Sequence, residues 1–170
     1  ITNFNAGDVT LDGYLVQWGA NRKLCWFDVN PQRTTYMHRV NPVTREADSE
    51  CINDLTGNKL GADLGINPIN NMVYTVATSS GRLYEVDIVT GVFTDTGISA
   101  PRCGYGAQYF DSDGFFYVAC NGGAVGGNIY RIDIRDPSNI GQPIHFANGP
   151  ESAINDGGRC ALAPSATLDY

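Results

Sequence analysis

The chain has 170 residues, of which 42% are hydrophobic and 17% are charged, and its formal net charge is −7. This hydrophobic content excludes a disordered chain, and the length suits one domain or a piece of a larger one. The negative charge argues against nucleic acid and anionic membrane surfaces as partners, because both attract lysine and arginine. No apolar run approaches the roughly 18 residues of a spanning helix, so we expect no membrane insertion. The sequence begins at Ile1 without a basic and apolar leader, which we interpret as a mature or excised segment.

The first predicted unit covers residues 5–40, where apolar and polar residues alternate with the period of two that marks a strand with one packed face. An Asp-Gly pair inside the unit is typical of a tight hairpin turn. The expected strands are NAGDVTL (5–11), DGYLVQW (12–18), RKLCWFD (22–28) and RTTYMHRV (33–40). The polar segment that follows, residues 41–59, is expected to be an inserted loop.

The same order of strands occurs again in residues 60–97 and 104–147, and residues 148–170 form a C-terminal closing segment. GRLYEVD (81–87) matches GNIYRID (127–133), and each ends in an aspartate that can fix a turn by bonding the backbone two residues on. The remaining expected strands are 60–66, 70–77, 92–97, 104–110, 113–120 and 142–147.

The spacing of the units predicts the fold class. Asp28, Asp87 and Asp133 occupy matched positions 59 and 46 residues apart, close to the repeat of about 40–50 residues in β-propeller blades. We therefore expect an all-β chain with about three four-stranded antiparallel blades, and a β-sandwich is the alternative. A closed propeller needs about four to eight blades, so three would leave open faces. We expect self-association, or contact with a complementary chain segment.

Two stretches resemble a propeller-like repeat domain of unknown function found in bacterial secreted and cell-surface, adhesin-like proteins. These are LGINPINNMVYTV with GRLYEVDIVTG, and the closing INDGGRCALAP with LDY. The resemblance covers residues 60–170 well and residues 1–59 poorly. It implies an extracellular repeat module in large adhesin-like or filament-forming proteins, and it supplies no catalytic residues.

The five cysteines include no Cys-x-x-Cys pair, which argues against a zinc cluster. Reduced, buried thiols of an intracellular protein are one interpretation. We favour an oxidising compartment, and hence an extracellular or cell-surface location, because the sequence is turn-rich and several cysteines lie in loop-like segments. Cys51 with Cys160 and Cys103 with Cys120 are the candidate disulfides. The odd count leaves at least one thiol free or paired outside the chain.

Candidate site residues are few. His38 and His145 fall on the expected outer strands of separate units, so we expect structural roles and no catalytic site. Asp111 and Asp113, in the loop DSDG, could ligate calcium through oxygen, although a hairpin turn is the simpler interpretation. Aromatic residues could line a face that binds glycan or peptide, or could pack between blades. The candidates are Trp18, Trp26, Tyr105 and Tyr109.

Three functions remain open. The first is a non-catalytic extracellular structural or adhesion module, a subunit or segment of a larger surface or filamentous assembly. The second is a glycan- or peptide-binding propeller, and the third is a fragment of a propeller hydrolase. No nucleophile motif or metal-binding pattern favours an enzyme, and no cofactor is expected apart from possible calcium.

Overall fold

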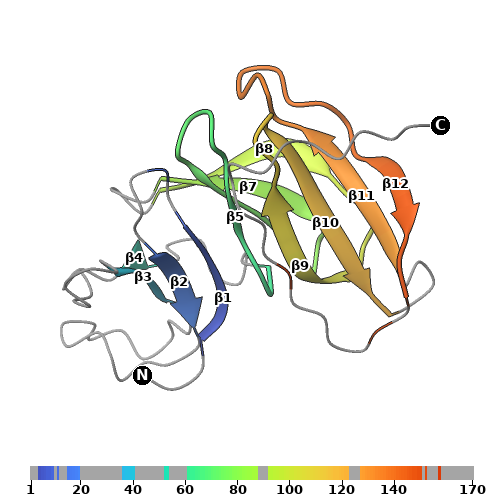
Figure 1. Cartoon of the computed structure of the whole chain (residues 1–170), viewed down its shortest axis with the longest axis horizontal. Helices are drawn as coiled ribbons and strands as arrows, with labels where there is room; N and C mark the ends of the chain where they lie inside the picture. The colour runs from blue at the N-terminus through green and yellow to red at the C-terminus, as the bar shows by residue number, and fades with distance from the viewer. Residues whose placement is uncertain are drawn as a thin grey trace.

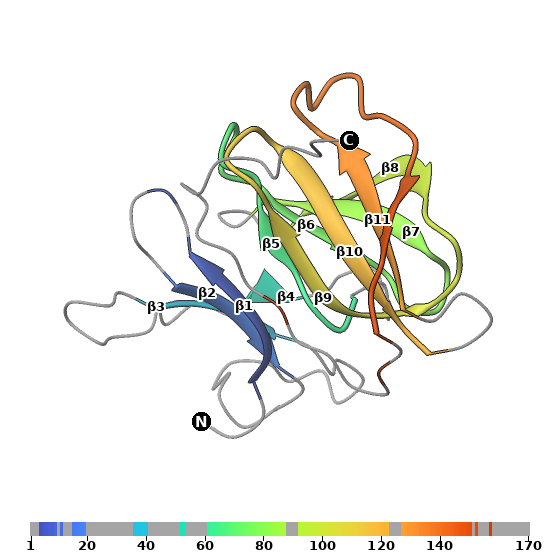
Figure 2. The same cartoon turned by 45° about the vertical axis from the view of Figure 1, so that its right-hand side comes forward.

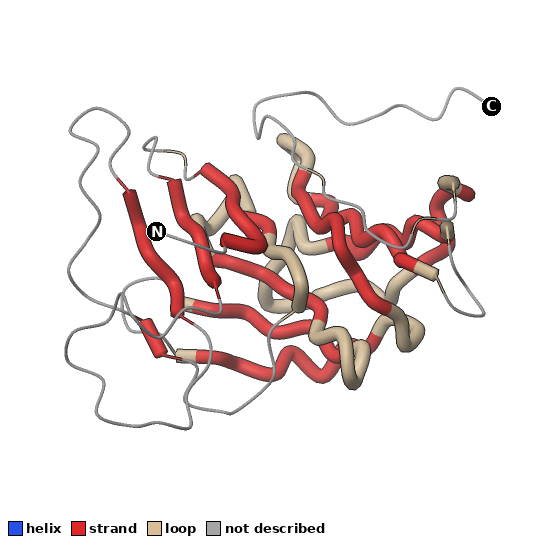
Figure 3. The backbone as a smooth tube through the Cα atoms, turned by 90° about the horizontal axis from the view of Figure 1, so that it is seen from below, coloured by secondary structure: helices blue, strands red, loops and turns tan. Residues whose placement is uncertain are grey.

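The computed structural model of the chain describes residues 4–9, 11, 15–19, 36–40, 52–53, 61–87, 92–122, 127–150, 152 and 157. Every regular element in these residues is a strand, and Figure 3 shows the strands joined by loops. The prediction of an all-β chain is confirmed. Across the same residues, no helix has the length and apolar character needed to cross a membrane.

The described strands form three four-stranded antiparallel sheets, each with its strands bonded in chain order (Figure 1). The first sheet contains β1 (Phe4–Val9), β2 (Leu15–Gly19), β3 (Tyr36–Val40) and β4 (Ile52–Asn53). The second contains β5 (Gly65–Ile66), β6 (Val73–Val76), β7 (Arg82–Val86) and β8 (Phe93–Ser99). The third contains β9 (Gly104–Phe110), β10 (Phe115–Asn121), β11 (Asn128–Asp133) and β12 (Ile144–Asn148). Three sheets, rather than the two of a sandwich, match the predicted blades.

The first sheet differs from the expected strand order. β3 pairs directly with β2, from Leu15 opposite Val40 to Gly19 opposite Tyr36, so this segment is the third strand and not the outermost one. The outermost strand is β4, which comes from the segment expected to be an inserted loop. The expected strand 22–28 lies outside the described residues. A long connection between β2 and β3 is tolerable because the entropy cost of closing a loop grows slowly with its length.

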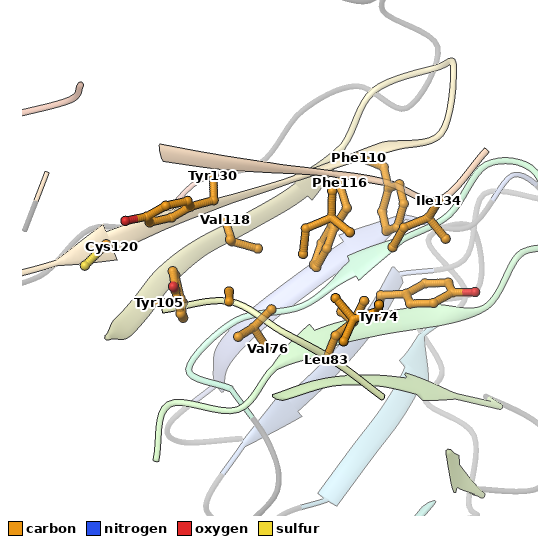
Figure 4. Packing of buried hydrophobic residues seen from close by; sticks show 13 residues of the cluster. Tyr74, Val76, Leu83, Tyr105, Phe110, Phe116, Val118, Cys120, Tyr130 and Ile134 are labelled. Carbon is orange, nitrogen blue, oxygen red and sulfur yellow. The ribbon is translucent and has the colours of Figure 1, made fainter. Parts of the chain in front are cut away.

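The main core lies between the second and third sheets (Figure 4). The register of β6 and β7 places Tyr74 and Val76 on one face of the second sheet. This face packs against the residues of β10 and β11 that point into the core from the third sheet. The ring of Tyr74 meets the ring of Phe110 edge-on at 5.5 Å, and Phe110 stacks on Phe116 at 4.6 Å. Burial of these rings supplies the main hydrophobic stabilisation of the two sheets.

The innermost strands of the three sheets, β1, β5 and β9, are neighbours in space (Figure 2). Gly65 permits this proximity, because a Cβ atom there would lie 2.9 Å from Cε2 of Phe116 and 3.2 Å from Cα of Tyr109. Three four-stranded sheets that adjoin through their inner strands match the three blades predicted from the spacing of the units.

Candidate functional site

Side chains in the inner strands, or just before them, connect each sheet to the next. The amide of Ile66 donates to Oδ2 of Asp8 at 2.7 Å, which ties the second sheet to the first. The amide of Gln108 donates to Oδ2 of Asp63 at 2.7 Å, which ties the third sheet to the second. The amide of Val76 in turn donates to Oε1 of Gln108, also at 2.7 Å. Asp63 and Gln108 are almost completely buried, so these charge-assisted and amide bonds form in a weakly screened interior.

This network was not among the residues predicted from the sequence. Its signal is present in β1, before β5 and in β9, as AGDV (6–9), GADL (61–64) and GAQY (106–109). Each strand places a side chain with an oxygen acceptor after two small residues. Thr75 completes the network, because its hydroxyl donates to the carbonyl of Asp63 at 2.8 Å and accepts from the amide of Gly61 at 3.0 Å.

A second feature is the face of the third sheet that points away from the second sheet, here called the end face. Alternation along β10 sends Phe116 and Val118 into the core and sends Phe115 and Tyr117 to the opposite side. The end face consists of Ala107, Tyr109, Phe115, Tyr117, Arg131 and Phe146.

The aromatic rings of the end face are in mutual contact. Tyr109 stacks on Tyr117 with ring centroids 5.4 Å apart, and Phe146 meets Tyr117 edge-on at 5.1 Å. The guanidinium carbon of Arg131 lies 4.6 Å from the ring centroid of Phe115 and 5.3 Å from that of Phe146. Such cation–π contacts hold the arginine against the sheet and keep its charge available at the surface.

The hydroxyl of Tyr117 donates to Oδ2 of Asp111 at 3.0 Å. Burial raises the pKa of Tyr117 to about 12, the carboxylate of Asp111 acts in the same direction, and Arg131 acts against it. The phenol therefore stays protonated at neutral pH and serves as a hydrogen-bond donor.

The structure gives Asp111 a role in the turn between β9 and β10. Its Oδ1 accepts from the amides of Asp113 and Phe115, at 3.1 Å and 2.9 Å, and its Oδ2 accepts from Tyr117. Asp111 is fully buried, whereas Asp113 is exposed at the turn. No group of three or more histidine, cysteine or acidic residues suited to a metal ion occurs in the described part of the chain. Calcium binding at Asp111 and Asp113 stays a prediction.

The structure describes the side chains of two of the four aromatic residues expected to line a ligand face, and these two lie on opposite sides of the third sheet. Tyr105 is fully buried in the core, and its hydroxyl donates to the carbonyl of Pro101, so it has no exposed ring to offer a ligand. Tyr109 is half-buried on the end face, on the other side of the sheet. Trp18 lies in β2, where the structure describes its backbone and not its side chain. Trp26 lies outside the described residues.

Cys103 and Cys120, one of the two pairs expected from the sequence, are joined by a disulfide. The bridge connects the residue before β9 with the penultimate residue of β10. Cys51 and Cys160 lie outside the described residues. The disulfide fixes the beginning of the third sheet, where the chain arrives from the outer strand of the second.

The two histidines lie in different sheets. His145 is on the outermost strand β12, as expected, where Nε2 pairs with Oδ1 of Asn148 at 2.9 Å and the ring meets Tyr130 edge-on. His38 is on β3, opposite Gln17, and so occupies the third strand of its sheet and not the outer strand.

The family model of a repeat of unknown function, DUF6923, matches residues 2–162. A search of the curated proteins found no significant match. Among solved structures, an auxiliary nutrient binding protein from Bacteroides ovatus matches with a TM-score of 0.62 and 17% identity, over 89% of this chain and 33% of that one. Hydrazine synthase from Kuenenia stuttgartiensis matches with a TM-score of 0.58 and 17% identity, over 88% of this chain and 38% of that one.

A second auxiliary nutrient binding protein, from Bacteroides thetaiotaomicron, matches with a TM-score of 0.53 and 14% identity, over 90% of this chain and 33% of that one. These neighbours are propeller-like proteins, so the predicted propeller-like arrangement is confirmed. The chain spans about a third of the length of the nutrient-binding proteins it matches. At such low identities the likeness shows the fold alone.

Proposed function

Since the chain belongs to the DUF6923 family, a repeat of unknown function, we propose that it acts as a non-catalytic structural and adhesion module. In this role it forms one arc of a β-propeller within a larger extracellular assembly. The proposal concerns the part played by the whole protein, because the chain corresponds to about a third of its nutrient-binding structural neighbours.

One observation carries the proposal, namely the use of buried polar side chains to hold neighbouring sheets together. Asp63 accepts hydrogen bonds from the amides of Leu64 and Gln108, and Asn67 donates from Nδ2 to the carbonyl of Ile134 at 3.0 Å. Catalytic groups need polar atoms that are directed toward a substrate. Here the buried polar atoms are directed toward the next sheet, which suits a scaffold.

The disulfide between Cys103 and Cys120 supports an extracellular location. Structural disulfides persist in oxidising compartments and are rare in the cytosol. The acidic surface implied by the net charge of −7 suits a soluble surface module that avoids nucleic acid.

Protease shaving of intact source cells, followed by mass spectrometry, tests the location. Peptides from this chain should be released before any cytosolic marker is. Beads coated with the oxidised chain should then adhere to the surface that the cells colonise, and beads coated with the reduced chain should adhere less. Release of the chain only after lysis would contradict the proposed location. Turnover of a substrate that persists in the His145→Ala variant would contradict the proposed non-catalytic role.

A ligand-binding propeller is the second candidate, favoured by the two structural neighbours that are named as nutrient binding proteins. Tyr109 is the one predicted ligand-binding aromatic that lies partly exposed on the described surface. Glycan-array binding that is abolished by Tyr109→Ala, and retained by the distant Arg82→Ala variant, would establish this function in place of the first.

A further inference from the structure

The loop between β11 and β12 contains the one Asp-Pro bond of the sequence, between Asp136 and Pro137 (Figure 1). Such a peptide bond is chemically weak, because the aspartate carboxyl can reach the carbonyl carbon of its own residue by closing a five-membered ring. The proline nitrogen carries no hydrogen and is a better leaving group than an ordinary amide nitrogen once it takes up a proton. Asp136 and Ser138 are exposed, so water reaches this turn.

The turn holds the carboxylate of Asp136 in one position. Its Oδ1 accepts hydrogen bonds from the amide of Ser138 at 3.0 Å and from the hydroxyl of Ser138 at 2.6 Å. These two bonds restrict a side chain that would otherwise rotate freely at an exposed site. A side chain that is already fixed loses less entropy when it closes the ring.

The carbonyl group of Asp136 is held and polarised by the same turn. The amide of Asn139 donates to the carbonyl oxygen of Asp136 at 2.9 Å. A donor in this place stabilises the negative charge that develops on the oxygen when the carbonyl carbon is attacked. The turn therefore fixes both reacting groups of one residue.

We propose that the folded chain cuts its own backbone between Asp136 and Pro137 in mild acid, where a carboxyl group carries the proton that the reaction needs. A carboxyl oxygen bonds to the carbonyl carbon of Asp136, and the carboxyl proton passes to the nitrogen of Pro137. The C–N bond then breaks and leaves its electron pair on that nitrogen. The products are a cyclic anhydride at Asp136 and a secondary amine at Pro137. One water molecule opens the anhydride to two carboxyl groups.

The charged groups beside the turn are Asp133, Arg135 and, from the turn between β9 and β10, Asp113. Arg135 donates to Asp133 at 3.0 Å and 2.7 Å, and it also interacts electrostatically with Asp113. These two bonds direct the charge of Arg135 to the carboxylate of Asp133.

A cut at this bond should leave the fold in place. β12 lies beyond the cut and is paired with β11 through four residue pairs. The amide of Gly141 also donates to the carbonyl of Asp133 at 2.8 Å, which closes the loop on the far side of the cut. The two fragments should therefore stay associated in size-exclusion chromatography and separate only on a reducing, denaturing gel.

Incubation of the full chain in mild acid, at the lowest pH where circular dichroism shows the native fold, tests the proposal. Mass spectrometry should detect fragments 1–136 and 137–170. They should form at least about tenfold faster than in the same buffer with urea, because only the folded turn fixes the reacting groups. Asp136→Asn should abolish the cut. Ser138→Ala should slow it while the circular dichroism spectrum stays unchanged.

Gln142→Asp supplies a matched control within one molecule. It places a second Asp-Pro bond before Pro143, where the next residue is Ile144, which has no hydroxyl to hold the carboxylate. Cleavage before Pro137 should exceed cleavage before Pro143 at least about tenfold. The proposal is overturned by equal rates at the two bonds, by equal rates in the folded and unfolded wild type, by a folded chain that stays intact, or by a Ser138→Ala variant that is cut as fast as the wild type.

Discussion

The amide nitrogen of Gln108 lies 2.7 Å from Oδ2 of Asp63, and this hydrogen bond joins the innermost strand of the third sheet to the segment that leads into the second. Oδ1 of the same carboxylate accepts from the amide of Leu64 at 2.8 Å. Asp63 is 1% exposed, so water cannot replace it as the acceptor of either bond. One buried carboxylate thus contributes to the attachment of the third sheet to the second, beside the aromatic core and the bond between Val76 and Gln108.

Replacement of Asp63 by alanine should lower the free energy of unfolding by about 3 kcal/mol, because two buried amides lose their acceptor. Urea denaturation followed by circular dichroism measures the change. Asp95→Ala is the matched control, because Asp95 pairs with Arg82 at an exposed site and should cost less than about 1 kcal/mol. Equal losses in the two variants would show that the buried carboxylate has no special role.

Gly65→Ala should lower the free energy of unfolding by about 1–3 kcal/mol, because its Cβ atom would lie 2.9 Å from the Phe116 ring and push β5 away from β9. The control is Gly104→Ala, where the nearest atom to the new Cβ lies 3.8 Å away. Thermal unfolding of both variants decides the matter. A Gly104→Ala variant that is less stable than Gly65→Ala would contradict this account of the inner strands.

Reduction of the disulfide between Cys103 and Cys120 should lower the free energy of unfolding by about 3 kcal/mol, as expected for a closed loop of this length. Denaturation with and without a phosphine reductant measures the loss. In the double variant Cys103→Ala and Cys120→Ala, the same loss should be present before reduction. If the double variant is as stable as the oxidised wild type, the bridge does not stabilise the third sheet.

The ion pair of Asp133 and Arg135 should make a small contribution to the free energy of unfolding that is lost at acid pH. Nε and Nη2 of Arg135 donate to Asp133 at 3.0 Å and 2.7 Å, and these bonds lower the pKa of the carboxyl below its ordinary value of 3.8. The stabilisation is therefore complete at pH values above 3.8. It is lost as the pH falls through the lower pKa that Asp133 has in the folded state. Both side chains are substantially exposed, so solvent screens the pair and its contribution to stability should be small.

Nuclear magnetic resonance titration of the Asp133 carboxyl tests this directly. Arg135→Gln should raise the pKa of Asp133 toward its ordinary value and remove this acid-dependent part of the stability. The variant also removes the contact between Arg135 and the Phe115 ring at 4.4 Å, so only the pH-dependent part of the stability loss reports on the pair with Asp133. An unchanged Asp133 pKa in the variant would refute the assignment.

The second and third sheets could be predicted from the sequence because their strands alternate with a period of two and end at Asp or Gly turns. The first sheet could not be ordered correctly. The segment 22–28, which lies outside the described residues, carries the sequence pattern expected of the third strand, whereas Tyr36–Val40 takes that place through five pairs with β2. Strand pairing depends on partners distant in sequence, and a local pattern does not contain that information.

The aromatic candidates show a second limit. Tyr105 and Tyr109 are four residues apart, so an ideal strand would place both rings on one face. An irregularity in the pairing, between Ala119 and Cys120 of β10, shifts the register, and the two rings lie on opposite sides of the sheet. A bulge of this kind depends on how two strands meet, and nothing in either strand alone predicts it.

The bonds between inner strands also have a direction along the chain. Asp8 accepts from Ile66, and Asp63 accepts from Gln108, so in each case the acceptor is synthesised before its donor. During translation, the acceptor carboxylate therefore leaves the ribosome before the strand whose amide donates to it. The array is suited to grow from its N-terminal end, one sheet at a time.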